Sequence, residues 1–158
     1  MDRAQLEALA PEIAYDVRMV TGTAVRHEIE TAELEKSREH DTGRTRLVSF
    51  AVTESCLIHL RNMDDFLGGP ADGRVTAADY VAGWTFERFL TAEERAAIDS
   101  SLSALTPERH AADPDWPLLR IAAGAFEAFN VFVDALDPEA ATWFGDEIAE
   151  AALLTAWT

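Results

Sequence analysis

The chain has 158 residues and a net charge of −16, and 48% of its residues are hydrophobic. That length and hydrophobic content fit one globular domain with a real core, and they exclude wholesale disorder. The acidic charge repels phosphate backbones and so disfavours RNA binding, although Arg44, Arg46 and Arg61 could still form a local basic pocket.

No apolar run is long enough to cross a membrane, and the N-terminal sequence lacks the apolar block of a signal peptide. Cys56 is the only cysteine, so it has no partner for an internal disulfide bond. We therefore expect a cytoplasmic protein without a membrane-spanning segment.

The apolar residues recur at helical spacing between clusters of glycine and proline, and no stretch alternates as a strand would. The first predicted helix begins at Pro11, which suits a first helical position because proline has no N–H to donate. It ends in the charged stretch of residues 30–40. The second predicted helix covers about 45–67 and stops at Gly68, because glycine accepts a left-handed turn.

Shorter helices are predicted after these two. One follows Thr76 with Asp79 in its first turn, and the next covers about 92–105, where Thr91 and Glu94 have capping-box spacing. A strongly apolar helix is expected at 117–136, and a last helix opens at 137–138 and continues through Trp143, Phe144, Ile148, Leu153 and Leu154. Four to five main helices with short connections predict an all-α, up-down bundle that forms a single domain over residues 1–158.

The second predicted helix carries the most informative side chains. On a helical wheel Glu54, Arg61 and Asp65 fall within one narrow arc among apolar residues, while His59 lies on the flank of the opposite side. Arg61 and Asp65 have the i, i+4 spacing that lets two side chains meet. Two interpretations stay open: an internal brace of these four residues, or an arginine held by acids that binds an anionic group. They differ in whether Arg61 is buried against acids or lines an open cleft.

The sequence contains no complete catalytic or metal-binding motif. No glutamate lies three residues before a histidine, as in di-iron bundles, and hydrolase elbows and phosphate loops are absent. Cys56 lacks an identifiable base partner and is interpreted as a small buried side chain. A pocket lined by Trp84, Phe86, Trp116 and Phe126 stays open as a further interpretation, although aromatic residues at helical spacing usually form core. We therefore expect no metal and no cofactor.

Two segments, SFAVTESCLIHLRNMDDFL (49–67) and LSALTPERHAADPDWPLLRIA (102–122), resemble a family of small bacterial helical proteins. That family is similar to the HEPN domains of bacterial defence and toxin–antitoxin proteins. The matching residues are Glu54, Ser55, His59, Arg61, Asn62 and Phe66, followed by Leu105, Thr106, Arg109 and Trp116. The resemblance covers about residues 12–136 and implies a HEPN-like helical bundle that forms a homodimer.

Active HEPN ribonucleases carry Arg-Asn-x-x-x-His, whose arginine and histidine act on the 2′-OH and the scissile phosphate. This chain keeps Arg61 and Asn62 but has Phe66 in place of that histidine, and phenylalanine cannot transfer a proton. The first hypothesis is therefore a non-catalytic module that binds a second copy or another protein. The alternative is a metal-independent ribonuclease in which Arg61 acts with His59 or His110. The missing histidine and the acidic charge favour the first.

Overall fold

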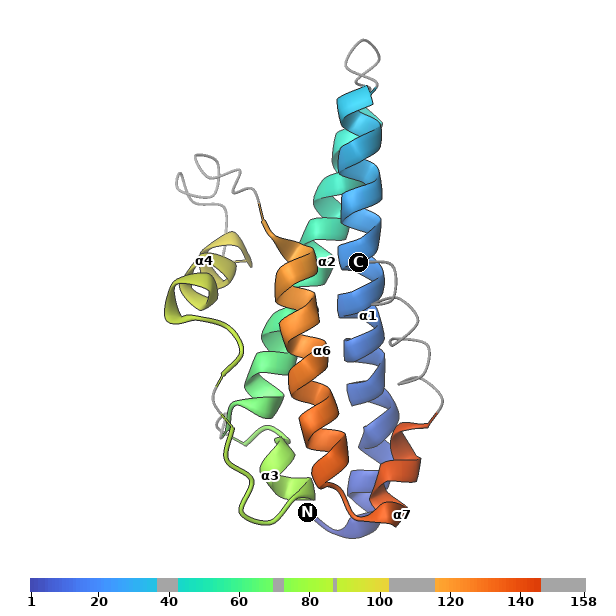
Figure 1. Cartoon of the computed structure of the whole chain (residues 1–158), viewed down its shortest axis with the longest axis vertical. Coiled ribbons are helices and arrows are strands. Elements are labelled where there is room, and N and C mark those ends of the chain that lie inside the picture. The colour runs from blue at the N-terminus through green and yellow to red at the C-terminus, as the bar shows by residue number, and fades with distance from the viewer. Residues whose placement is uncertain (37–42, 70–72, 87, 103–115, 146–158) are drawn as a thin grey trace.

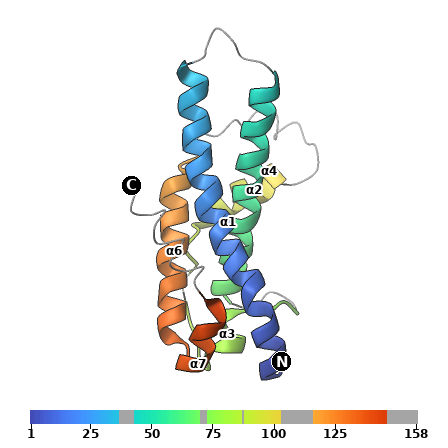
Figure 2. The ribbon, with the colours of Figure 1, turned by 90° about the vertical axis from the view of Figure 1, so that its right-hand side faces the viewer.

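The structure is a computed structural model, and it describes residues 1–36, 43–69, 73–86, 88–102 and 116–145. Throughout these ranges the regular secondary structure is helical, which confirms the predicted all-α class. Three long helices form the centre: α1 (Arg3–Lys36), α2 (Gly43–Leu67) and α6 (Leu118–Ala135). α1 and α2 are antiparallel neighbours, and α6 packs against both while running in the same direction as α2 (Figures 1 and 2).

Shorter elements close the bundle beside these helices. They are α3 (Ala77–Tyr80), α4 (Ala92–Leu102), α7 (Pro138–Ala141) and the 3-10 helix η1 (Thr142–Phe144). α4 packs on α2, while α7 and η1 lie at the end of the bundle near the start of α1 (Figure 1). None of the helices within the described ranges is both long and apolar enough to cross a membrane.

The start of α1 differs from the prediction. α1 begins at Arg3, and Pro11 lies inside it, so the predicted start at Pro11 is wrong. Asp2 begins the helix because its carboxylate accepts the N–H of Gln5 at 2.9 Å. Pro11 has no N–H to donate to the carbonyl oxygen four residues before it. Because Pro11 is exposed, water can bind that oxygen instead. A single lost hydrogen bond does not end a helix whose inner side is packed.

The end of α2 confirms the predicted stop. The N–H of Gly68 closes the last turn on the carbonyl oxygen of Asp64 at 2.9 Å, and Gly69 follows with a left-handed φ of 105°. Gly68 is also required for packing, because a Cβ there would lie 2.6 Å from Cγ of Arg88. The glycine therefore allows Arg88 to lie across the C-terminal end of α2.

Local capping accounts for the starts of α3 and α4. The Asp79 carboxylate accepts the N–H of Thr76 at 2.9 Å, as its place in the first turn predicts. At α4, the N–H of Thr91 donates to the Glu94 carboxylate at 2.9 Å and the Glu94 N–H donates to the Thr91 hydroxyl at 3.1 Å. This confirms the predicted capping box, while the predicted end of the helix at 105 lies outside the described residues.

The last elements follow the predicted positions closely. α6 starts one residue after Pro117, and Asp137 caps α7 by accepting the N–H groups of Glu139 and Ala140 at 3.0 and 2.9 Å. The predicted helical course through Trp143 and Phe144 takes the form of α7 and η1. The predicted positions Ile148, Leu153 and Leu154 lie outside the described residues.

The core is centred on Phe132 of α6, which is fully buried. Its ring centroid lies 5.1 Å from that of Phe66, 5.4 Å from Phe144, 5.7 Å from Trp84 and 5.8 Å from Tyr80. All four contacts are edge-to-face, an arrangement that the quadrupoles of aromatic rings favour. This cluster joins α2, α3, η1 and α6 at one end of the bundle.

The aromatic residues considered as a pocket are part of this packing. Trp84 stacks on Phe86 with 5.7 Å between ring centroids, and its indole N–H donates to the carbonyl oxygen of Leu67 at 2.9 Å. Trp116 and Phe126 are buried members of the core. These aromatic side chains fill space between helices, and only Phe126 of the four lines the small apolar depression between α1, α2 and α6.

Replacing Phe132 by alanine tests the centre of the core. We expect Phe132→Ala to lower the free energy of unfolding by about 3–5 kcal/mol, because it removes a buried ring and leaves a cavity. The neighbouring Val131 is 51% exposed, so Val131→Ala is the matched control and should change stability by about 0.5 kcal/mol or less. Urea unfolding followed by circular dichroism measures both, and equal losses in the two variants would contradict this core.

Candidate functional site

The polar side chains of α2 point to two different neighbouring helices. His59 and Asn62 lie on the side that faces α1, whereas Arg61 and Asp65 lie on the side that faces α4. The turn of the helix separates these two sides because successive residues differ by about 100°. The polar side chains of α2 therefore form two separate groups of contacts, one with α1 and one with α4.

On the α1 side, His59 is partly buried against Asp16. Its Nδ1 lies 2.5 Å from the Asp16 carboxylate, and the ring of Tyr15 packs edge-on against the imidazole at 5.6 Å. The side-chain amide of Asn62 donates to the same carboxylate at 3.5 Å, while most of Asn62 is exposed. His59 thus joins α2 to α1 through one hydrogen-bonded carboxylate.

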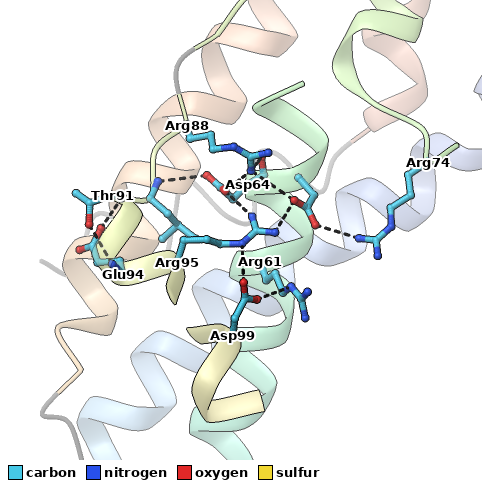
Figure 3. Close-up of polar contacts among 10 residues, drawn as sticks. Arg61, Asp64, Arg74, Arg88, Thr91, Glu94, Arg95 and Asp99 are labelled. Atoms are coloured by element: carbon cyan, nitrogen blue, oxygen red, sulfur yellow. Dashed lines mark hydrogen bonds and ion pairs between the residues drawn. The ribbon is translucent and has the colours of Figure 1, made fainter. Parts of the chain in front are cut away.

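On the α4 side, Arg61 forms an ion pair with Asp99 of α4. Arg61 Nε lies 3.0 Å from Asp99 Oδ1, and both atoms are buried although the two side chains are partly exposed. The i, i+4 spacing had suggested an ion pair between Arg61 and Asp65. The structure instead pairs Arg61 with Asp99 (Figure 3), and it pairs Asp65 with arginines from outside α2.

Asp64 is the most deeply buried ionisable side chain of this group, with an exposed fraction of 0%. Its Oδ2 accepts a hydrogen bond from Arg88 Nη1 at 2.6 Å and another from Arg95 Nη1 at 2.7 Å. The backbone N–H of Leu90 donates to Oδ1 at 3.3 Å. A carboxylate removed from water in this way needs such donors, because desolvation of an ion costs several kcal/mol.

Asp65, the next residue on α2, belongs to the same network of ion pairs. It accepts hydrogen bonds from Arg95 Nη2 at 2.7 Å, Arg74 Nη1 at 3.0 Å and Arg88 Nη1 at 3.4 Å. Burial alone would raise the pKa of Asp65, but the hydrogen bonds and charges of these arginines outweigh it and hold the pKa below its ordinary value. Arg95 therefore bridges both aspartates of α2.

Arg95 is itself held in place from two directions. Burial works against its charge, but the hydrogen bonds and charges of Asp65 and Asp64 prevail and raise the pKa of Arg95.

Arg95 stands on α4, where the preceding residue, Glu94, closes the capping box and also binds Arg120 of α6. The hydrogen bond from Arg120, with those of Thr91, overcomes burial and lowers the pKa of Glu94. This chain of ion pairs runs from α2 through α4 to α6.

We call this group the arginine–aspartate network. It consists of Arg61, Asp64, Asp65, Arg74, Arg88, Arg95 and Asp99. The predictions contained only Arg61 and Asp65 of it. The sequence does indicate that Asp64 is buried. It lies four residues after Leu60 and three before Leu67, which places the three side chains on one face of the helix. A buried aspartate requires cations from elsewhere in the chain.

The remaining candidate residues do not converge with these. Glu54 lies on the exposed side of α2, and His110 lies outside the described residues. Cys56 is buried, and burial raises the pKa of its thiol to about 11, so the reactive thiolate is scarce at neutral pH. The structure therefore does not bring His59 and Arg61 to one reacting point within a single chain.

The described residues offer no enclosed space for a ligand among these groups. A shallow depression with no room for a water molecule lies between α1, α2 and α6, and its lining is formed by Val17, Val20, Thr21, Met63, Ala125 and Phe126. Its accessible lining is apolar, and Phe126 is the one residue in it that the sequence had suggested for a pocket. Within the described part of the chain, no three His, Cys, Asp or Glu side chains gather as metal ligands would.

No family model, curated protein or solved structure matches the chain.

Removing the charge of Asp64 tests the network directly. We expect Asp64→Asn to lower the free energy of unfolding by about 3 kcal/mol, because Arg88 and Arg95 lose their shared buried carboxylate. Asp99 is 44% exposed at its side chain, so Asp99→Asn should cost about 1 kcal/mol or less. Urea unfolding at pH 7 compares the two variants, and a loss at Asp64 no larger than that at Asp99 would contradict the importance of burial.

The lowered pKa of Asp65 predicts a dependence on pH. In the unfolded chain the carboxyl has a pKa of about 3.9, and in the folded chain its pKa is lower. The ionised group therefore stabilises the fold above pH 3.9 and this stabilisation disappears as the pH falls through the folded value. The difference in unfolding free energy between wild type and Asp65→Asn should shrink from about pH 5 downward. A difference independent of pH would show that the ionised form contributes nothing.

Proposed function

We propose that this chain is a non-catalytic, HEPN-like helical bundle that acts as a binding module, either as a homodimer or with another protein. The setting in which we propose that it works is a bacterial defence or toxin–antitoxin system, as the resemblance of residues 49–67 and 102–122 implies. The proposal assigns the polar residues of α2 to holding helices together and leaves recognition to the surface.

The observation that carries the proposal is the divergence of His59 and Arg61. A general base and a cation that stabilises a phosphate must reach the same reacting atoms. Here His59 is bound to Asp16 of α1, and Arg61 is bound to Asp99 of α4, so the two side chains serve different helix pairs. Their contacts support a brace more than a nuclease centre.

Phe66 adds a second line of support. It stands where a HEPN ribonuclease has its histidine, and it is buried in the aromatic cluster, 5.1 Å from Phe132 and 6.0 Å from Tyr80 between ring centroids. A residue buried among rings has no access to an RNA substrate and no proton to transfer. The position therefore contributes to the core of this bundle.

A nuclease assay combined with unfolding tests this proposal. Purified wild type incubated with total RNA should leave the RNA intact, as should Arg61→Ala. Arg61→Ala should lower the free energy of unfolding by about 1 kcal/mol, since it removes a partly exposed ion pair. For a chain of this size that change corresponds to a fall in Tm of roughly 2–4 °C.

A double-mutant cycle supplies the control. If Arg61 acts through Asp99, the losses of Arg61→Ala and Asp99→Ala should not add, with a coupling of about 0.5 kcal/mol or more. RNA cleavage by wild type that Arg61→Ala abolishes would overturn the proposal in favour of a ribonuclease. An unchanged Tm together with an unchanged molar mass on light scattering would exclude the brace.

A further inference from the structure

α4 packs on the rest of the bundle with little apolar surface. Ile98 is the one buried side chain of its eleven residues, while Ala97 and Leu102 are partly buried. α6, by contrast, places eight buried side chains in the core over its eighteen residues. Among the described helices, α2 is the main neighbour of α4 (Figure 1). Apolar burial therefore contributes much less per residue to the position of α4 than to that of α6.

Two of the ion pairs that hold α4 involve side chains that water already reaches. Asp99 binds Arg61 of α2 at 3.0 Å, and Glu94 binds Arg120 of α6. The side chains of Asp99, Arg61 and Arg120 are 44%, 39% and 64% exposed. Exposed pairs of this kind contribute little to stability, because water can replace each partner. Separating α4 from α2 and α6 at these two points therefore has a small cost in free energy.

The third attachment of α4, through Arg95, also permits separation. Arg95 donates to Asp64 and to Asp65 at 2.7 Å each. Asp64 has a second arginine, Arg88 at 2.6 Å, which does not belong to α4. Asp65 likewise has Arg74 at 3.0 Å. Because neither carboxylate loses its last cation when α4 moves away, the desolvation penalty that usually opposes breaking a buried ion pair is reduced.

The chain before α4 has an anchor of its own. Leu90 is buried, and its N–H donates to Asp64 at 3.3 Å. Arg88 binds the same aspartate from the same segment. The capping box of Thr91 and Glu94 begins immediately after this anchor. Movement of α4 can therefore leave the preceding segment attached to α2.

We propose that α4 is a lid that opens from α2 as one unit while α1, α2 and α6 remain packed. Opening separates Asp99 from Arg61 and uncovers the surface beneath Ile98, so a partner that binds this side of α2 has access only when the lid is open. An isolated helix of eleven residues is too short to be stable in water, so α4 unravels when it leaves α2. Its backbone N–H groups then exchange with solvent, which makes the opening measurable.

Native-state hydrogen exchange of the full chain, measured with increasing urea, tests the lid. The backbone amides of α4 from Arg95 onward should exchange through an opening that is about a hundredfold or more better populated than the one that exposes α6. The population of the α4 opening should also depend less on urea, because less surface is exposed. Equal populations and equal urea dependence in the two helices would show that α4 leaves only when the whole chain unfolds. Exchange of α4 at the rate of an unstructured peptide would exclude a closed state.

A core variant separates the opening of the lid from unfolding of the chain. The ring neighbours of Phe132 lie outside α4, so its packing is the same whether the lid is open or closed. Phe132→Leu should therefore accelerate exchange in α6 by about tenfold and leave exchange in α4 unchanged. Phe129→Leu, at a second fully buried ring of α6, should give the same pattern. Circular dichroism establishes that each variant is folded, and acceleration of both helices by the same factor would overturn the lid.

Arg95 and Arg88 form a matched pair that tests the role of the ion pairs. Both bind the same oxygen of Asp64, at 2.7 and 2.6 Å, but only Arg95 belongs to α4. Arg95→Gln should raise the ratio of open to closed lid by about tenfold or more, because its contacts with two carboxylates exist only in the closed state. Arg88→Gln should not raise this ratio, since Arg88 holds Asp64 in both states. An equal increase in the two variants would overturn the lid, whereas RNA cleavage by wild type would contradict only the proposed function.

Discussion

The buried carboxylate of Asp64 is the constraint on which the α4 side of the structure depends. It has no exposed surface, and it would be costly to bury without the donors of Arg88, Arg95 and the Leu90 N–H. These donors come from the chain between α3 and α4 and from α4 itself. Satisfying one aspartate therefore determines how that chain approaches α2 and where α4 begins. Gly68 makes the approach possible, because a side chain there would collide with Arg88.

The position of α4 in turn decides what Arg61 can do. Asp99 lies one turn after Arg95 on α4, so a helix anchored by Arg95 at Asp64 brings Asp99 to Arg61. The arginine is then restrained by the ion pair between its Nε and Asp99. His59 is committed to α1 on the other side of the helix. The two residues that first suggested chemistry are separated by the same packing that gives each of them a structural partner.

Sequence reasoning succeeded where the cause of a feature lies within a few residues of it. The stop at Gly68, the helix that follows Thr76 with Asp79 in its first turn and the capping box at Thr91 are local, and the structure has all three. It failed where the partner is distant: Arg88 and Arg95 reach Asp64 from 24 and 31 residues away, and no periodicity connects them. The i, i+4 rule states that Arg61 and Asp65 can meet, but competing partners from other elements decide whether they do.

The inner and outer sides of α2 thus have different tasks. Ions on the inner sides are paired within the chain, and pairing of this kind removes them from recognition, because a neutralised and desolvated charge attracts little from outside. Phe50 and Ile58 lie on the outer side of α2 and are about half exposed. A helix that first suggests a catalytic site is, on these contacts, better suited to hold its own bundle together.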